Sequence, residues 1–217
     1  VAIDGPAGVG KSTVAKLLAS RLGFLYMDTG ALYRAVAWHV LHKKIDPADS
    51  EAVASLLPAL SIQMQLKDGL ATVLVNGANI TAELRTGAVS AAASIVSAIP
   101  AVRAWLLPMQ RQIGSQSSVV AEGRDIGTKV FPEADIKFFL EADAAVRTQR
   151  RHRELVAAGH TGAIEQTSAD LMGRDSRDRS RAVAPLVAAE DAQHLDTSSM
   201  EVEDVVNHMM AVITAKL

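Results

Sequence analysis

In the first 42 residues, short apolar runs alternate with stretches in which apolar residues recur at helical spacing. A short β-branched run at 1–3 is followed by a glycine-rich turn, and over 12–22 the apolar positions recur at helical spacing. A second apolar run at 24–27 leads into another helical stretch at 31–42, and Gly23, which separates the first helix from this run, is typical of a helix end. The order strand, helix, strand, helix predicts a parallel sheet covered by helices.

The spacing changes to a period of two residues between 61 and 80. Apolar and polar residues alternate over 61–66, as expected of a strand with one buried face. Two more runs of strand length follow at 71–75 and 78–80, and the turn pairs Asp68-Gly69 and Asn76-Gly77 separate the three runs. This segment is predicted to be a three-stranded antiparallel meander.

The rest of the chain supplies further elements of a covered parallel sheet. Runs of strand length lie at 118–121, 136–140 and 195–196, and helical patterns lie at 51–57, 88–98, 102–113, 144–157 and 202–217. The stretch 159–167 is loop-like, and 168–181 is dense in charge. We therefore expect a single α/β domain over 1–217, with the meander in an inserted subdomain at 59–115.

Composition limits the possible functions. The chain has 217 residues, enough for one domain with a buried core, and its formal net charge of −2 gives no global basic field for coating nucleic acid. It has no Cys, so thiolate metal sites are excluded, and its six His residues form no metal-binding pattern. No apolar run is long enough to span a bilayer, and no signal-like segment opens the chain. We expect a soluble cytoplasmic protein without nucleic-acid or membrane partners, and we expect that a few residues precede Val1 in the natural protein.

A phosphate-binding loop follows the first strand. Residues 5–12 match the pattern G-x-x-x-x-G-K-S/T, and they lie between an expected strand and an expected helix, the context that gives this pattern its meaning. Glycines let successive backbone N–H groups converge on phosphate oxygens, Lys11 reaches the β- and γ-phosphates, and the Ser12 hydroxyl is a candidate ligand for Mg²⁺. Arg150 is a candidate contact for the adenine, with a surface position as the alternative. The predicted ATP-binding residues are Gly5, Pro6, Ala7, Gly8, Val9, Gly10, Lys11, Ser12, Thr13 and Arg150.

Charged residues at the ends of expected strands are candidates for the acceptor side. Thr29 is expected to cap the helix that carries Arg34, and Arg34 is a candidate for holding an acceptor phosphate, with a plain surface Arg as the alternative. Glu122 follows an apolar strand and is a candidate for binding Mg²⁺ through water. Arg124 and Asp125 together match the hydrogen-bonding edge of cytosine; the alternative is that Arg124 binds the acceptor phosphate and Asp125 orients it.

Four Arg and two Asp residues lie between 174 and 181. Two nucleotides brought together place several negative charges side by side, so a phosphoryl-transfer site needs a cluster of Arg to offset repulsion and stabilise the transferring group. Asp175 and Asp178 would hold the guanidinium groups when no ligand is bound. The alternative for this segment is a solvated helix with surface ion pairs.

Four motifs, in order along the chain, resemble those of bacterial cytidylate kinases. They are I-D-G-P-A-G-V-G-K-S-T at 3–13, D-T-G-A-L-Y-R at 28–34, E-G-R-D-I-G-T at 122–128 and R-D-S-R-D-R-S-R-A-V-A-P-L at 174–186. The resemblance implies a P-loop three-layer α/β/α fold with a central parallel sheet, in which 59–115 is an inserted acceptor-binding subdomain and 158–182 is a short Arg-rich lid. It also implies a kinase that transfers the γ-phosphoryl of ATP in line to CMP and dCMP, with Mg²⁺ as the cofactor.

The resemblance assigns roles to individual residues. The CMP-binding residues would be Thr29, Arg34, Ser94, Arg103, Arg124, Asp125, Asp178 and Arg181. The catalytic residues would be Lys11, Arg124, Arg174 and Arg181. The metal would be held by Ser12 and, through water, by Glu122.

Two other functions compete with this interpretation. The first is a different small-metabolite kinase of the same fold, acting on uridylate, shikimate or dephospho-coenzyme A. The second is a P-loop binding module that senses ATP without transferring phosphate, although an Arg-rich lid would then have no evident purpose. The lack of an N-K-x-D guanine-reading motif favours a kinase over a GTPase, and nothing in the sequence requires more than a monomer.

Overall fold

The computed structural model describes residues 1–67, 70–157, 159 and 161–216. The chain forms two compact units, one made of Val1–Gly23 together with Val120–Leu217, and the other of Phe24–Val119. We call them the P-loop unit and the middle unit. The predicted subdomain at 59–115 lies inside the middle unit.

The larger sheet is parallel and has the strand order β2-β6-β1-β7-β8. Strand β1 pairs in parallel with both β6 and β7, and β7 pairs in parallel with β8. The central strands are buried on both faces, which explains why their sequences are short continuous apolar runs. The strands are β1 (Ala2–Asp4), β2 (Leu25–Asp28), β6 (Val119–Glu122), β7 (Lys137–Glu141) and β8 (Gln193–Asp196). The predicted parallel α/β fold is confirmed.

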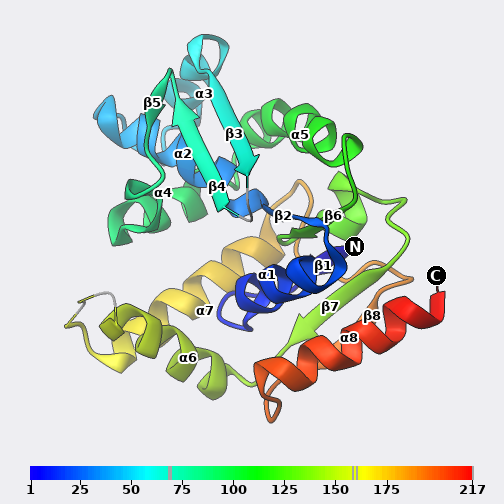
Figure 1. The fold of residues 1–217 in the computed structure, drawn as a ribbon. Helices are drawn as coiled ribbons and strands as arrows, with labels where there is room; N and C mark the ends of the chain where they lie inside the picture. Colours follow the sequence, from blue (N-terminus) through cyan, green and yellow to red (C-terminus); the bar gives the residue numbers. More distant parts are fainter. Residues whose placement is uncertain (68–69, 158, 160, 217) are drawn as a thin grey trace. The chain divides into compact units, whose positions relative to one another are not determined.

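Among the described residues, the P-loop unit has four α-helices (Figure 1). They are α1 (Lys11–Leu22), α6 (Ala144–Ala157), α7 (Ile164–Ser180) and α8 (Val202–Lys216). Helix α1 packs against α8, and α6 packs against α7. Ile3, Leu18, Phe138, Met209 and Ile213 are fully buried in the core of this unit.

The start of α7 corrects one expectation. Residues 159–167 were expected to be loop, but α7 begins at Ile164. The buried positions of this helix are Thr167, Leu171, Asp175 and Asp178, so its inward face is mostly polar. A hydrophobic pattern cannot reveal a helix whose buried side carries carboxylates, because the pattern depends on apolar residues recurring on one face.

The middle unit contains the predicted meander. Strands β3 (Ile62–Lys67), β4 (Leu70–Val75) and β5 (Ala78–Asn79) form an antiparallel sheet. Asn76 and Gly77 both have positive φ, as the predicted turn between β4 and β5 requires. The other predicted turn, Asp68-Gly69, lies outside the described residues. The helices of this unit are α2 (Thr29–His42), α3 (Ser50–Leu56), α4 (Gly87–Val96) and α5 (Pro100–Ser115).

Within the described residues, no helix is by itself both long and apolar enough to cross a membrane. Helices α4 and α5 reach the required length and composition only as a pair, and they are bent by 101° where they meet.

Candidate active site

The P-loop connects β1 to α1 with the geometry that its glycines allow. Gly5, Gly8 and Gly10 have φ values of 148°, 79° and 94°, which side-chain-bearing residues rarely adopt. A Cβ atom on Gly5 would collide with the carbonyl oxygen of Leu140 on β7, and one on Gly8 would lie 3.0 Å from the carbonyl oxygen of Arg147 on α6. The loop is therefore held close to β7 and α6 by the absence of side chains.

Lys11 is buried at the start of α1 and points back over the loop. Its Nζ donates hydrogen bonds to the carbonyl oxygens of Gly5 (2.8 Å) and Pro6 (2.6 Å). Burial, helped by the nearby positive charge of Arg124, lowers the pKa of Lys11 to about 7, although Glu122 and other carboxylates act in the opposite direction. The site thus holds a lysine whose positive charge is disfavoured until an anion compensates it.

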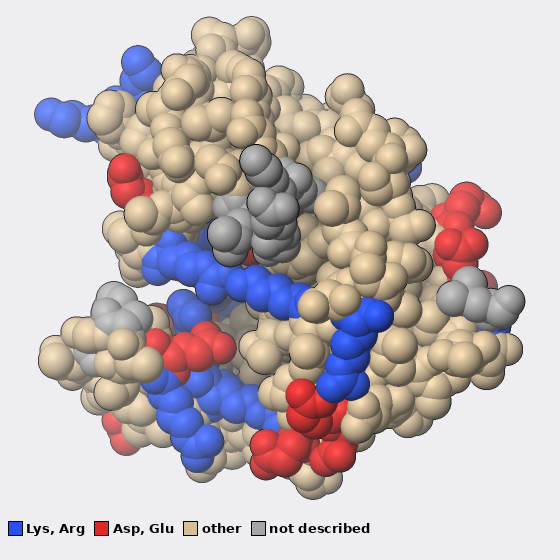
Figure 2. Space-filling model, viewed as in Figure 1, with Lys and Arg blue, Asp and Glu red and all other residues tan. Residues whose placement is uncertain are grey.

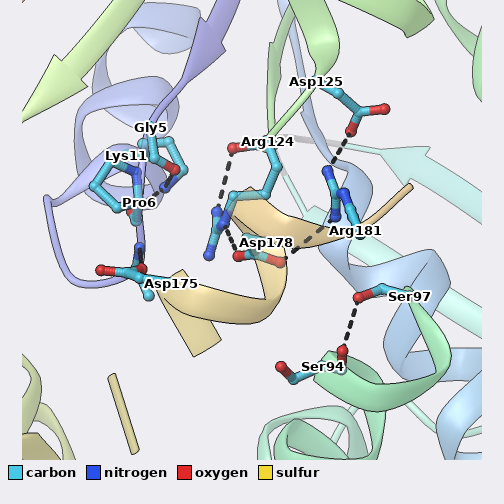
Figure 3. Close-up of polar contacts among 12 residues, drawn as sticks. Gly5, Pro6, Lys11, Ser94, Ser97, Arg124, Asp125, Asp175, Asp178 and Arg181 are labelled. Carbon is cyan, nitrogen blue, oxygen red and sulfur yellow. Dashed lines mark hydrogen bonds and ion pairs between the residues drawn. The ribbon is translucent and has the colours of Figure 1, made fainter. Parts of the chain in front are cut away.

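A chain of alternating charges lies beside the P-loop (Figure 3). Arg124 Nε donates to Asp178 Oδ2 at 2.8 Å. Arg181 Nη1 lies 3.5 Å from Asp178 Oδ1, and Arg181 Nη2 lies 3.6 Å from Asp125 Oδ1. The structure therefore brings together, from the end of β6 and from α7, four of the residues that the sequence analysis predicted for the site.

The charge states in this chain are fixed by its ion pairs. Burial alone would raise the pKa of Asp178, but the charge and hydrogen bond of Arg124, with Arg181 and Arg174, outweigh burial and hold that pKa below its ordinary value. Burial alone would lower the pKa of Arg124, yet the pairing with Asp178 raises it. Asp178 thus holds guanidinium groups in place, as expected from the alternation of charges.

Asp175 forms a second, unexpected pair, with Arg147. Arg147 Nη1 donates to the Asp175 carboxylate and, at 3.0 Å, to the carbonyl oxygen of Ala7 in the P-loop. The Asp175 carboxylate also accepts from the Ala7 backbone N–H at 3.2 Å. The pair therefore holds both polar groups of one P-loop residue, and it lines a cavity of about 490 Å³ between α6 and α7.

Sequence reasoning chose a different arginine of α6 and missed Arg147. The guanidinium of Arg150 donates to the side-chain and backbone oxygens of Thr197 and to the carbonyl oxygen of Met200, so it is held by the loop after β8. Its role beside the adenine stays a prediction. Helical periodicity could have pointed to Arg147, because it lies about one turn before Arg150 on the same helix. Nothing in the sequence, however, indicates which of the two arginines contacts the P-loop.

Glu122 and Ser12 are the groups available to a metal ion. Glu122 is buried at the end of β6, in register with Ile3, two residues before the P-loop begins. No group of three His, Cys, Asp or Glu side chains suited to a metal ion occurs in the described parts of the chain. One carboxylate and one hydroxyl fit Mg²⁺ that takes most of its ligands from phosphates and water.

The middle unit holds the other predicted acceptor residues, beginning with Arg34. Arg34 Nη2 forms an ion pair with Asp28 Oδ2 at 2.6 Å. Gly30 makes room for this pair, because a Cβ atom there would lie 3.0 Å from the Arg34 guanidinium. The expected cap is corrected: Asp28 caps α2 by accepting from the Ala31 N–H, while Thr29 is the first, buried residue of the helix. An Asp placed directly before the helix supplies the same oxygen acceptor one residue earlier.

Arg103 and Ser94 lie on the two helices that pack against α2. The Arg103 guanidinium lies 5.3 Å from the centre of the Tyr33 ring and donates to the carbonyl oxygen of Ser97. Ser94 is buried, and its carbonyl oxygen accepts from the Ser97 hydroxyl. The Arg103 side chain is thus held within the middle unit.

Basic and acidic side chains are interspersed on the surface shown in Figure 2. Lys and Arg side chains lie next to Asp and Glu side chains in several places, and other residues form most of this face. This face therefore carries no broad field of one sign.

Comparison with known proteins gives a consistent result. The family model described as cytidylate kinase matches residues 1–215. The cytidylate kinase of Pelotomaculum thermopropionicum is 47% identical over 216 residues, covering 99% of this chain and 96% of that protein. That of Pasteurella multocida is 42% identical over 217 residues, covering 100% of this chain and 96% of that protein. A crystal structure of an uncharacterized protein from Eubacterium ventriosum shares the fold at 13% identity, with a TM-score of 0.52 over 99% of this chain and 97% of that one.

Some relatives are much longer than this chain. The bifunctional pantoate ligase/cytidylate kinase of Synechococcus sp. WH7803 is 48% identical over 209 residues, which cover 95% of this chain and 43% of that protein. The chain therefore spans less than half the length of the bifunctional relatives and nearly the full length of the others. With a family model that matches residues 1–215, the chain belongs to the cytidylate kinase family.

Proposed function

We propose that this chain transfers the γ-phosphoryl group of ATP to CMP and dCMP, giving CDP and dCDP. The observation that carries the proposal is the match of the cytidylate kinase model to residues 1–215. The cluster of Arg124, Asp178 and Arg181 beside a P-loop supports it, because a kinase that joins two anionic nucleotides needs such a cluster.

The P-loop would bind the donor. Backbone N–H groups of the loop residues 7–13 would donate to the phosphate oxygens of ATP, and Lys11 would move from the carbonyl oxygens of Gly5 and Pro6 to the phosphate oxygens. Ser12 and, through water, Glu122 would hold Mg²⁺. When bound, this ion neutralises charge on the β- and γ-phosphates.

The acceptor phosphate needs no strong general base. Its oxygens are already anionic, so the protein's work is to position the two nucleotides, stabilise charge and exclude water. We assign charge stabilisation to Lys11, Arg124, Arg174 and Arg181. Water exclusion is assigned to the lid at 158–182, which contains α7.

We assign binding of the acceptor to Arg124, Asp125, Asp178 and Arg181 and to Thr29, Arg34, Ser94 and Arg103. An Asp acceptor beside an Arg donor matches the edge of cytosine, which offers an amine donor and two acceptors. The alternative, in which Arg124 binds the phosphate and Asp125 orients it, is compatible with the same ion pairs.

A coupled assay of ADP release tests the proposal. MgATP is supplied with CMP, dCMP, UMP, AMP, GMP or shikimate at equal concentrations. Fast turnover with CMP and dCMP, with little or none for the rest, is expected, and Lys11→Ala should abolish it without unfolding the protein. Turnover of a different acceptor, or nucleotide binding without any product, would overturn the proposal.

We also propose that the active form is a cytoplasmic monomer whose partners are these nucleotides. Light scattering after size exclusion, with and without ATP and CMP, measures the oligomeric state directly. A stable dimer would contradict this part of the proposal.

A further inference from the structure

The side chain of Asp4 lies at the end of β1, directly before the P-loop, and is buried. Its two carboxylate oxygens accept hydrogen bonds from two successive backbone N–H groups, Oδ1 from Ile126 and Oδ2 from Gly127, each at 2.8 Å. Ile126 and Gly127 begin a short π-helical turn, Ile126–Val130, that follows β6. One carboxylate thus takes two backbone donors that would otherwise be buried without acceptors.

The same strand holds the other side of this loop. The backbone N–H of Gly123 donates to the carbonyl oxygen of Ile3 at 2.9 Å. Arg124 and Asp125, the two residues between these anchors, are therefore fixed at both ends to β1, by the Ile3 carbonyl before them and by the Asp4 carboxylate after them. Neither anchor involves the side chains of Arg124 or Asp125, which remain directed toward Asp178 and Arg181.

Gly127 is confined on two sides, which leaves its N–H little freedom. A Cβ atom there would lie 3.1 Å from Cδ of Lys137 and 3.5 Å from Oδ2 of Asp4. Lys137 is itself held, because its Nζ donates to the carbonyl oxygen of Pro132 and to Asp191. The aliphatic part of the Lys137 side chain therefore packs on one side of the Gly127 backbone, and the Asp4 carboxylate lies on the other.

We propose that Asp4 is a positioning residue for the acceptor nucleotide, which fixes Arg124 and Asp125 relative to the P-loop by holding the N–H groups of Ile126 and Gly127. The inference rests on the proposed function, because it assigns Arg124 and Asp125 to the acceptor. Asp4 touches neither substrate; it acts through the loop. Donor and acceptor groups are then joined rigidly, since Gly5 of the P-loop follows Asp4 directly in the chain.

The chemistry of Asp4 agrees with this role. Burial raises the pKa of Asp4 to about 6, even though the hydrogen bonds from Gly127 and Ile126 and the charge of Lys11 favour the charged form. The carboxylate is therefore kept in a place that disfavours its charge. An Asn would avoid that penalty, but its side chain has one oxygen acceptor, and its NH₂ group would face the second backbone N–H donor.

Asp4→Asn tests the inference against the wild type and against Asp204→Asn. Asp204 is an exposed aspartate in the first turn of α8. Loss of one charge-assisted hydrogen bond should raise KM for CMP, or lower kcat, by about ten-fold in Asp4→Asn, while the dissociation constant for MgATP changes by less than about two-fold. The amide proton resonances of Ile126 and Gly127 should shift in the same variant, and Asp204→Asn should match the wild type.

Gly127→Ala alters the hydrogen bond between the Gly127 N–H and Asp4 by changing the donor residue. It leaves every charge near Lys11 unchanged and displaces the Gly127 N–H from Asp4, so it should impair CMP in the same way with MgATP binding intact. It also serves as the test if Asp4→Asn does not fold.

The outcomes are distinguishable. Unchanged kinetics with CMP in either folded variant overturns the inference, as does a parallel loss of MgATP and CMP binding, which would assign to Asp4 only a general structural role. A wild type that does not phosphorylate CMP overturns the proposed function and the inference with it. The expected result, in which the kinetic constants for CMP change and the dissociation constant for MgATP does not, supports both the proposed function and the inference.

Discussion

Lys11 is the residue whose surroundings say most about ligand binding. Its Nζ donates to two carbonyl oxygens of the loop, and burial and Arg124 bring its pKa to about 7. A polyphosphate at the P-loop would replace those neutral acceptors by anionic ones and so raise this pKa. The charge of Lys11 and nucleotide binding are therefore linked.

This linkage predicts proton uptake on binding. At pH 8 the free site is mostly neutral at Lys11 and the bound site is charged, so each ADP bound should take up close to one proton. ADP binds best to the protein with a protonated Lys11, and this form becomes scarce in the free protein above a pKa of about 7. The affinity for ADP should therefore fall as the pH rises from 7 toward the pKa of Lys11 in the complex. Calorimetry at pH 8 in two buffers of different ionisation enthalpy measures the uptake. Lys11→Met should bind more weakly without uptake, and a wild type that takes up no proton would refute the linkage.

Asp125 is expected to act on one substrate only. It is buried directly before the π-helical turn Ile126–Val130, and its Oδ1 lies 3.6 Å from Arg181 Nη2. Asp125→Ala removes the carboxylate that we assign to the acceptor, so KM for CMP should rise by about 10- to 100-fold, and KM for ATP should change far less. Initial rates at varied CMP and ATP measure both constants, and the exposed Asp135→Ala is the matched control. Equal effects on both substrates would mean that the acceptor pocket is misplaced.

Helices α6 and α7 are joined to the P-loop by a buried ion pair. Arg147 on α6 and Asp175 on α7 have side chains that are 11% and 8% exposed, and both bind the backbone of Ala7. Arg151 and Glu154 form an exposed pair on α6 itself. The chain thus offers two ion pairs of the same chemistry that differ in burial.

Removing one partner of each pair should lower the free energy of unfolding by different amounts. Asp175→Ala leaves the Arg147 charge buried without its carboxylate, so the free energy of unfolding should fall by about 3–5 kcal/mol. Glu154→Ala removes an exposed partner and should lower it by about 0.5 kcal/mol or less. Urea unfolding followed by circular dichroism gives both values. Similar small losses would show that the Arg147–Asp175 pair does not hold α6, α7 and the P-loop together.

At the scale of elements, the pattern of apolar residues predicted the strands and helices that are stabilised by burial of apolar side chains. The central strands of the parallel sheet were predicted because they are buried on both faces, and the meander because its first strand alternates between buried and exposed positions. The start of α7 was predicted wrongly because its first turn has Ile164, its one strongly apolar residue, exposed and the polar Thr167 buried. Arg147 was missed for a related reason: its partner and the Ala7 backbone are distant in sequence, and only the fold brings them together.

At the scale of the whole molecule, motifs predicted more than periodicity did. The family was predicted from four motifs, and the match over residues 1–215 confirms it. The roles of individual residues stay predictions, because a motif specifies residue types and not contacts. Asp4 is the clearest example, since its position in I-D-G-P gives no sign that it holds backbone groups more than a hundred residues away.

Arg34 and Arg124 are both predicted, by resemblance, to bind CMP. The predicted ATP-binding residues are those of the P-loop and Arg150. A ligand at 100 times its dissociation constant stabilises the folded state by about 2.7 kcal/mol, so each nucleotide should raise Tm measurably. Arg34→Ala should therefore lose the rise in Tm caused by CMP and keep the rise caused by ADP.

Arg111 provides the control for this thermal-shift experiment, because it is an exposed arginine of the same unit, on α5. Arg111→Ala should keep both rises in Tm. Arg124→Ala, in the P-loop unit, should lose the rise caused by CMP just as Arg34→Ala does. If Arg34→Ala responded to CMP like the wild type, the middle unit would not bind the acceptor through Arg34, and the ion pair of Arg34 with Asp28 would be only part of the helix start. Loss in both variants would mean that CMP binding depends on Arg34 as well as on Arg124, which a binding module for ATP alone does not require.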